Sequence, residues 1–259
     1  MSNTAGRDGG LQSVDRAISV LEILARRGEA GVSEVATAIE VHKSTAFRLL
    51  GALEARGLVE QVADRGKYRL GFALIPLAGA VSDRLDVTRL GRSVCRRLAT
   101  ELRETINVAV LQEHYAVNVD QALGPSTVAS HNWIGRLTPL HCTSSGKVLI
   151  AHLDPGRRAG LLAVSGMPAL TPHTVTSTDR LDAELSTVRA TGYAVAVEEY
   201  ELGLNAVAAP VRDRAGEVVA AVSVSGPSYR LDRPRMTELV APLLAGTAEI
   251  STGLGFRAP

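Results

Sequence analysis

The amino-acid sequence predicts an α+β protein of two domains: a small helical domain with one β-hairpin, then a larger domain built on a mainly antiparallel sheet. Three observations predict this class. The chain has 259 residues, 46% of them hydrophobic, which is enough apolar material for two cores of ordinary size. Residues 11–71 show three helical apolar repeats followed by a hairpin pattern. From Ile106 onward, extended and helical segments alternate without a strict βαβ repeat.

The first elements follow from apolar spacing and from capping residues. Residues 1–10 are Gly-rich and polar, so we expect a disordered tail there. Apolar residues at helical spacing predict a first helix over residues 14–27, which ends at Gly28. A short second helix is expected at Ser33, because a serine hydroxyl is a good N-cap.

A third helix and a hairpin complete the first domain. The helix has four apolar residues at positions i, i+3, i+4 and i+7, namely Ala46, Leu49, Leu50 and Leu53. Gly57 then stands where a left-handed C-cap is expected, and residues 58–70 have the pattern of two short strands around a turn. Three helices and a hairpin within residues 11–71 describe a winged helix-turn-helix.

The second domain follows a helical connection. We expect a linker helix over residues 72–86 and the second domain over residues 87–255. The expected elements are a helix at 87–103, strands at 106–111 and 115–121, helices at 144–152 and 178–190, strands at 193–197, 206–212 and 218–225, and a helix at 234–252. This order is typical of an α+β domain around a mainly antiparallel sheet.

Composition excludes several classes of function. The 28 Lys+Arg and 27 Asp+Glu give a net charge of only +1, so any site for a polyanion must be local. The two cysteines, Cys95 and Cys142, fit no disulfide framework and no zinc-ligand spacing, and we expect neither a metal nor a cofactor. The sequence has no signal-peptide core and no run that would span a membrane, so we expect a cytoplasmic protein without membrane contact.

The polar edge of the third helix predicts contact with double-stranded DNA. If the apolar face packs on the core, the polar residues of the first turn project where a recognition helix meets base pairs. Cations on the hairpin would suit the adjacent phosphate backbone or minor groove. The residues expected to bind DNA are His42, Lys43, Ser44, Thr45 and Arg48 on the helix and Arg65, Lys67 and Arg69 on the hairpin.

Charge supports this interpretation through its distribution rather than its total. Residues 11–71 hold nine Lys+Arg and eight Asp+Glu, a difference of only +1. Between His42 and Leu53, however, there are two cations and no acid. The alternative is a winged helix that serves only as a protein-interaction module, because a fold alone does not fix a function.

One motif suggests catalysis instead. Residues 144–147, SSGK, fit the S-x-x-K nucleophile pattern of serine β-lactamases, but the supporting S-D-N and K-T-G elements are missing. His141 beside Cys142 could suggest a thiol nucleophile, yet neighbours on an extended chain point to opposite faces. We therefore expect no catalytic residue, and an S-x-x-K serine hydrolase is the less favoured alternative.

Several long segments form a more specific pattern. They are LQSVDRAISVLEILA, VSEVATAIEVHKSTAFRLLGALEARGLVEQ and GKYRLG in the first domain, and LTPLHCTSSGKVLIAHL, GYAVAVEEYELGLNAVAAPV and AAVSVSGPSYRL in the second. In order, from Leu11 to Gly253, the chain resembles the IclR family of bacterial transcriptional regulators. The resemblance implies a DNA-binding regulator, with repression favoured over activation. It also implies a homodimer or tetramer, a pseudo-palindromic operator, and a C-terminal domain that senses a small-molecule effector.

The resemblance also implies the residues of the effector site. In family members that bind small carboxylates, the ligand lies against the turn before the Gly-Lys pair, where backbone N–H groups could hold it, and against two strand serines. Such members carry an acid and a cysteine where this chain has two alanines, so we expect an acidic or polar effector with a larger or more apolar body than glyoxylate or pyruvate. The expected effector-binding residues are Ser144, Ser145, Gly146, Ala196, Ala206, Ser223, Ser225 and Trp133. Local hydrogen bonding by the two strand serines and simple packing of Trp133 are the alternatives.

Overall fold

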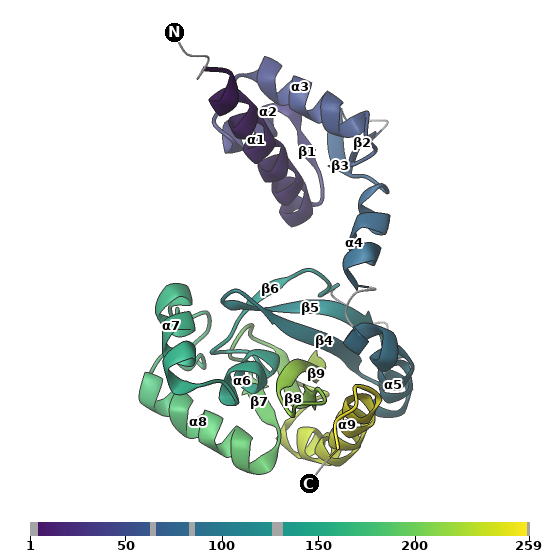
Figure 1. Ribbon diagram of the computed structural model, residues 1–259, viewed down its shortest axis with the longest axis vertical. Helices are drawn as coiled ribbons and strands as arrows, with labels where there is room; N and C mark the ends of the chain where they lie inside the picture. The colour runs from purple at the N-terminus through teal and green to yellow at the C-terminus, as the bar shows by residue number, and fades with distance from the viewer. Residues whose placement is uncertain (1–4, 63–65, 83–85, 126–131, 258–259) are drawn as a thin grey trace. The chain divides into compact units, whose positions relative to one another are not determined.

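The computed structural model describes residues 5–62, 66–82, 86–125 and 132–257. The chain divides into two compact units, residues 1–81 and residues 82–259, and each unit has its own core (Figure 1). None of the helices that the structure describes is both long enough and apolar enough to cross a membrane.

The first unit packs three helices against a three-stranded antiparallel sheet. Its elements are α1 (Ala5–Arg27), β1 (Ala30–Gly31), α2 (Val32–Ala38), α3 (Lys43–Glu54), β2 (Val59–Val62), β3 (Lys67–Leu70) and α4 (Leu74–Ser82). The strand order is β1-β3-β2, so the expected hairpin gains a third strand from the chain between α1 and α2. Leu24, Val35, Leu50 and Tyr68 meet in the core. The predicted winged helix-turn-helix is confirmed.

The helix ends of the first unit correct two expectations. We expected residues 1–10 to be disordered, but helix α1 already includes residues 5–10. The helix can extend this far because each residue added to a formed helix gains a hydrogen bond. The N-cap of α2 is Gly31, so Ser33 lies inside the helix. The Glu34 carboxylate accepts a hydrogen bond from the Gly31 N–H at 2.7 Å and satisfies the group that would otherwise lack a partner. Gly57 has φ +65°, as the predicted left-handed turn requires.

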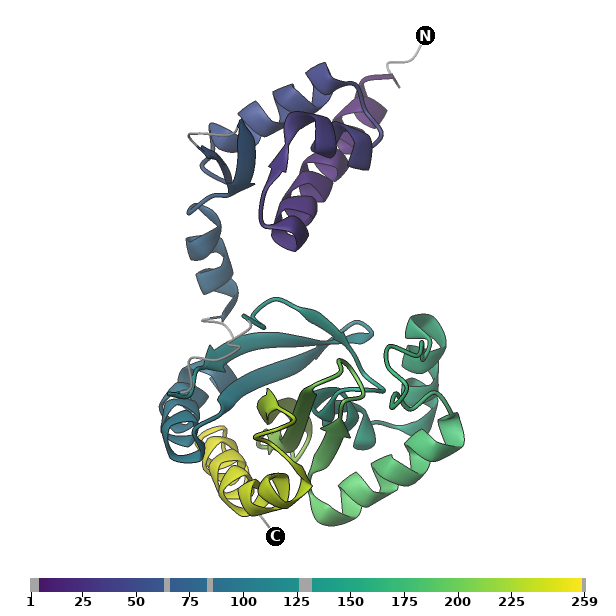
Figure 2. The same cartoon turned by 180° about the vertical axis from the view of Figure 1, so that it is seen from behind.

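The second unit is a six-stranded sheet with two helices packed against each face (Figure 1, Figure 2). Its elements are α5 (Asp86–Leu102), β4 (Thr105–Gln112), β5 (Tyr115–Ala122), β6 (Leu137–Pro139), α6 (Ser144–Ala151), α7 (Pro155–Ser165), α8 (Thr178–Thr191), β7 (Ala194–Val197), β8 (Leu204–Arg212), β9 (Val218–Pro227) and α9 (Arg233–Gly253). The strand order is β6-β5-β4-β9-β8-β7, and all neighbours are antiparallel. The predicted α+β class is confirmed.

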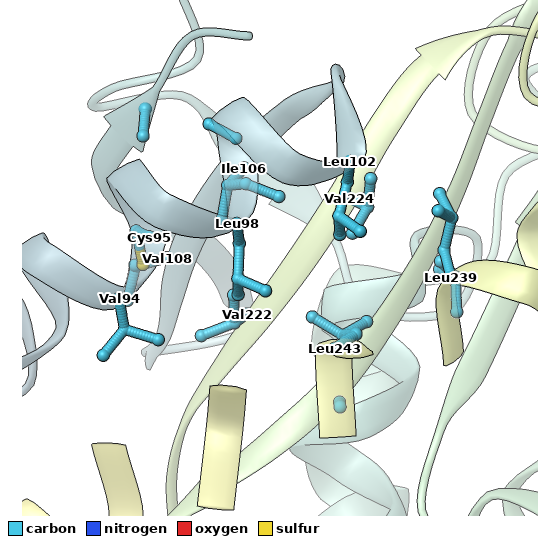
Figure 3. Close-up of a cluster of buried hydrophobic side chains, with 14 of the residues drawn as sticks. Val94, Cys95, Leu98, Leu102, Ile106, Val108, Val222, Val224, Leu239 and Leu243 are labelled. Carbon is cyan, nitrogen blue, oxygen red and sulfur yellow. The ribbon is translucent and has the colours of Figure 1, made fainter. Parts of the chain in front are cut away.

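Alternation along the strands separates the two faces of this sheet. In β9, Val222 and Val224 join the core under α5 and α9, which Figure 3 shows. Ala221 instead joins the core under α6 and α8. Because successive side chains of a strand point to opposite faces, Ser223 and Ser225 lie on the α6 face as well. The sheet therefore brings both serines to the side on which α6 begins.

Sequence patterns do not predict two short elements, β6 and α7. Strand β6 has only three residues and ends in a proline. Helix α7 has clear start signals, because Asp154 caps it and Pro155 is its first residue. It nevertheless has no buried residue. Leu161 and Leu162 pack against the core but stay partly exposed.

Candidate functional site

Helix α3 presents a polar N-terminal edge on the surface of the first unit. Its N-cap residue is His42, with φ −65° and ψ 146°. Lys43, Ser44 and Arg48 are exposed and Thr45 is half-buried, while the opposite face packs in the core. Neither Lys43 nor Arg48 forms a salt bridge with any residue that the structure describes. This edge therefore offers two cations to an external anion.

Phe47 lies next to this edge and was not among the expected DNA-binding residues. Its side chain is 60% exposed, although it belongs to the same helix turn as buried Ala46. An exposed aromatic ring on such a helix is suited to apolar contact with a thymine methyl group. The sequence signal was an apolar residue that falls outside the i, i+3, i+4, i+7 series of the buried face.

The cations of the β2–β3 hairpin are engaged by neighbouring acids. Lys67 Nζ lies 2.8 Å from Glu29 Oε1, and Arg69 Nε lies 2.6 Å from Glu60 Oε1. Both pairs are partly exposed, so they are weak and are screened by salt. Arg65, the third expected cation, lies outside the described residues. The hairpin therefore offers less free positive charge than the edge of α3.

The second unit contains a cavity between the start of α6 and the sheet. It is lined by seven of the eight residues expected to bind an effector: Ser144, Ser145, Ala196, Ala206, Ser223, Ser225 and Trp133. Its other lining residues are Asn107, Asn118, Thr138, Cys142, Thr143, Tyr200 and Leu204. No residue of this described lining is charged. The cavity can therefore bind a ligand through neutral hydrogen-bonding groups, backbone dipoles and apolar contacts.

Gly146 does not line the cavity, which corrects one expectation. A Cβ added at this position would lie 2.5 Å from the Leu140 carbonyl oxygen, so glycine permits a close approach between α6 and the preceding segment. The Gly146 N–H donates to Oγ1 of the N-cap residue Thr143 at 3.1 Å. The N–H groups of Ser144 and Ser145 have no acceptor among the described residues. These two groups, at the positive end of α6, are the ones that could hold a carboxylate.

Asn107 adds a polar group that the sequence analysis missed. It lies on β4 opposite Ser223 of β9, lines the cavity and is 3% exposed. Its Nδ2 donates to Ser225 Oγ at 3.0 Å, whereas its Oδ1 is buried and has no partner among the described residues. The available signal was an asparagine between Ile106 and Val108, which interrupts an otherwise apolar strand.

Apolar groups form the remaining walls. Ala196 of β7 pairs with Ala206 of β8, so two methyl groups lie side by side in the cavity wall. These are the positions at which an acid and a cysteine are expected in family members that bind small carboxylates. The rings of Trp133 and Tyr200 meet edge to face, with centroids 5.9 Å apart. Trp133 therefore both lines the cavity and packs against a neighbour. The cavity has a polar floor and apolar sides.

Lys147, the last residue of the SSGK segment, bounds a separate cleft on the α8 side. Its ammonium donates to Glu199 Oε1 at 2.6 Å, to Glu184 Oε2 at 2.7 Å and to the Val195 carbonyl at 3.2 Å. All three donors are occupied, and none of them by a serine. Burial raises the pKa of the Cys142 thiol to about 12, so this thiol is a poor nucleophile. The geometry therefore supports neither the S-x-x-K hydrolase nor a thiol enzyme.

Two family models match the chain. Residues 13–63 match the IclR helix-turn-helix domain, and residues 79–252 match the C-terminal domain of the bacterial transcriptional regulator IclR. Among curated proteins, the HTH-type transcriptional repressor AllR of Salmonella paratyphi A is 34% identical over 252 residues. That match covers 96% of this chain and 92% of the relative.

Solved structures show the same similarity. The IclR protein of Thermotoga maritima superposes with a TM-score of 0.79 at 27% identity, covering 95% of this chain and 100% of that one. An IclR homologue from Microbacterium hydrocarbonoxydans, complexed with 4-hydroxybenzoate, superposes with a TM-score of 0.78 at 27% identity, covering 94% of this chain and 98% of that one. Both similarities extend over the two units.

Proposed function

Because the chain belongs to the IclR family of bacterial transcriptional regulators, we propose that it represses transcription from a pseudo-palindromic operator and that a small organic acid controls this binding. The observation that carries the proposal is the exposed edge of α3, whose two cations have no acidic partner among the described residues. Repression is favoured because a relative that matches nearly the whole chain is a repressor. A protein that acts on chromosomal DNA is expected in the cytoplasm.

Helix α3 would lie in the major groove with its N-terminal turn against base edges. Lys43 would neutralise a phosphate, and Ser44 and Thr45 would donate to phosphate or touch bases. Arg48 has the length and the fork of donors to reach a guanine edge. Lys67 would contact a phosphate of the neighbouring DNA backbone, which would compete with Glu29 for its ammonium group.

A second copy of the chain is expected to cover apolar side chains that the first unit exposes. Val14 and Ile18 of α1 are 60% and 51% exposed, and Phe72 and Ile75, before and in α4, are 74% and 63% exposed. Isolated exposed apolar residues are ordinary, but this number in one small unit favours a homodimer or a tetramer built from dimers. Sedimentation of the wild type as a monomer at micromolar concentration would contradict this assignment. Phe72→Ser combined with Ile75→Ser should shift the protein toward monomer.

The cavity of the second unit would bind the effector. The free N–H groups of Ser144 and Ser145 suit a carboxylate, and the alanine pair with the aromatic wall suits an apolar body. The homologue that carries 4-hydroxybenzoate shows that a protein of this architecture accepts an acid of this kind. We therefore propose an acid with a body larger than that of glyoxylate or pyruvate. Effector binding would change the affinity for the operator through a coupling free energy between the cavity and the DNA-binding surface.

A selection of genomic DNA fragments followed by gel shift tests the DNA-binding half of the proposal. The purified protein should retain a small set of fragments, and its affinity for them should fall steeply as salt concentration rises. A protein-interaction module would retain no fragment above background. Such a result, with a correctly folded protein, would refute the proposal.

A ligand panel read by thermal shift tests the effector half. Acids with an aromatic or branched body should raise the melting temperature and change the affinity for the selected DNA. Strong stabilisation by glyoxylate or pyruvate, with none by the larger acids, would overturn the assignment of a larger body. The double variant Ser144→Pro, Ser145→Pro removes both N–H groups and should abolish the stabilisation by acids. Its unliganded melting temperature shows whether the fold survives.

A further inference from the structure

We propose that Phe47 contacts the C5-methyl group of a thymine in the major groove, so that each half of the operator carries a thymine beside the base pair that Arg48 contacts. The inference rests on the proposed placement of α3 in the groove and names a sequence feature of the DNA that this helix selects. It assigns a specificity-determining role to an uncharged, apolar residue of the recognition helix.

The exposure of the Phe47 ring is the observation that carries this proposal. The residue is 60% exposed, and it is the only large hydrophobic residue that is exposed in α3, a helix that the structure describes in full. It does not belong to the core cluster of the first unit, in which Ala46 and Leu50 are buried. Burying an apolar ring against an apolar partner is favourable compared with leaving it in water. The ring would therefore gain from a partner outside this unit.

The position of the ring over the first turn of α3 is a second observation. Lys43 and Ser44 precede Phe47 by four and three residues, so the three residues share one side of the helix. Because helical side chains lean toward the N-terminus, the Phe47 ring covers this first turn. The first turn is the part that a recognition helix places against base edges.

The groups around the ring favour DNA over a second protein as its partner. Lys43 and Arg48 are exposed and form no salt bridge with any described residue. Charged residues are depleted in the centre of protein interfaces, whereas phosphates attract both cations. The exposed face continues with Gly51 and Ala52, and nothing lies within 4 Å of a Cβ added at Gly51. No long side chain at these two positions would therefore hold the helix away from the groove.

The chemistry of the major groove identifies the thymine methyl group as the partner. A phenyl ring has no donor or acceptor, so against a polar base edge it would displace water without replacing the lost hydrogen bond. The C5-methyl group of thymine is the apolar group of the base edges in this groove, and apolar side chains contact it. An α-helix rises about 1.5 Å per residue and DNA about 3.4 Å per base pair, so Phe47 and Arg48 would reach the same or neighbouring base pairs.

Deletion of single methyl groups from the operator tests the inference with the full-length protein. The probe is a synthetic duplex with the sequence of a retained genomic fragment, in which each thymine in turn is replaced by deoxyuridine. This replacement keeps the base pairing and removes only the C5-methyl group. Dissociation constants are measured by gel shift for the wild type, Phe47→Ala and Phe47→Gln, of which the second keeps a long side chain and a good helix former. Tyr229→Ala, which truncates a ring that is 75% exposed in the second unit, is the control.

One thymine in each half-site should be sensitive to this replacement in the wild type. Loss of its methyl group should weaken binding about fourfold, which corresponds to one buried methyl group. The weakening should disappear in Phe47→Ala and Phe47→Gln and persist in Tyr229→Ala. The sensitive thymine should lie within about two base pairs of the position whose preference relaxes in Arg48→Ala.

Several results would overturn the inference. One is a wild type that binds all the deoxyuridine duplexes as tightly as the unmodified duplex. Another is a methyl effect that survives in the Phe47 variants, because another residue would then contact the methyl group. A third is a loss of affinity in these variants without any methyl effect in the wild type, as expected if the ring kinks the duplex as a wedge. Because Phe47 is exposed, both variants should melt near the wild-type temperature, and either one that folds decides the comparison.

The outcome separates this inference from the proposed function. If the protein retains genomic fragments but no methyl group affects the affinity, DNA binding stands and only the thymine contact is lost. If the protein retains no fragment, the proposed function fails and the inference fails with it.

Discussion

Arg48 is a residue whose surroundings leave it available for DNA, because it has no salt bridge with any described residue. Arg48→Ala should weaken binding to the selected fragments by about 1–3 kcal/mol if the guanidinium reads a base. It should also relax the preference at one base pair. Titrated gel shifts at a fixed salt concentration measure both effects. Arg26→Ala, which removes an exposed cation from the end of α1, is the control, and an equal loss in both variants would indicate a general charge effect.

Two glycines of the second unit should respond in opposite directions to alanine. A Cβ on Gly146 would lie 2.5 Å from the Leu140 carbonyl oxygen, whereas nothing lies within 4 Å of a Cβ on Gly160 in α7. Gly146→Ala should therefore destabilise the fold by about 1–3 kcal/mol through overpacking. Gly160→Ala should be neutral or stabilise by up to about 1 kcal/mol, because alanine is the better helix former. Thermal unfolding measures the difference, and equal melting temperatures would contradict the packing argument.

At the scale of one element, the ion pair between Lys67 of the β2–β3 hairpin and Glu29 leads to a prediction about DNA affinity. Lys67→Ala should weaken binding to all sequences similarly and reduce the slope of log affinity against log salt by about one, if Lys67 meets a phosphate. Glu29→Gln removes the acid that lies 2.8 Å from Lys67 and should strengthen binding. Gel shifts over a salt series measure both slopes. An unchanged slope in Lys67→Ala would place the hairpin away from the backbone.

Strand β9 shows how one element serves the core and the cavity together. Val222 and Val224 pack under α5 and α9 (Figure 3), while Ser223 and Ser225 line the cavity at the start of α6. Because this alternation has a period of two, a register slip of one residue would exchange core and cavity residues. The antiparallel pairing of Asn107 with Ser223 therefore also fixes the polar floor of the cavity.

For the molecule as a whole, we predict a loss of stability in moderately acidic solution. Burial, with Arg212 and Arg189 nearby, lowers the pKa of His152 from 6.5 to about 4. The neutral imidazole therefore stabilises the folded state above about pH 6.5, and this contribution is lost as the pH falls toward 4. His152→Asn should show a smaller fall in melting temperature over that window. His173→Asn, at an exposed position, should follow the wild type, and identical pH profiles for all three proteins would refute the assignment.

The sequence by itself predicted the elements whose signals are local. Helical apolar repeats predicted α3 and α5, two apolar segments around a turn at residues 213–216 predicted β8 and β9, and Gly57 predicted a left-handed turn that the structure confirms. Helix α7, whose Leu161 and Leu162 pack only partly buried against the core, was not predicted. The polar edge of α3 was also predictable, because residues on one side of a helix are related by a fixed spacing.

Only the tertiary structure decided which polar side chains have a hydrogen-bond or salt-bridge partner. Lys67 pairs with Glu29, 38 residues away in sequence, so its reduced availability depends on how the hairpin packs beside α1. Sequence similarity placed Ser144, Ser145 and their partners in one site, but only the structure shows Gly146 packed against Leu140 and outside the cavity. The hydrogen bond from Asn107 to Ser225, 118 residues away in sequence, likewise forms only because β4 pairs with β9. Local patterns specify the elements, whereas hydrogen-bond satisfaction depends on contacts between residues far apart in the chain.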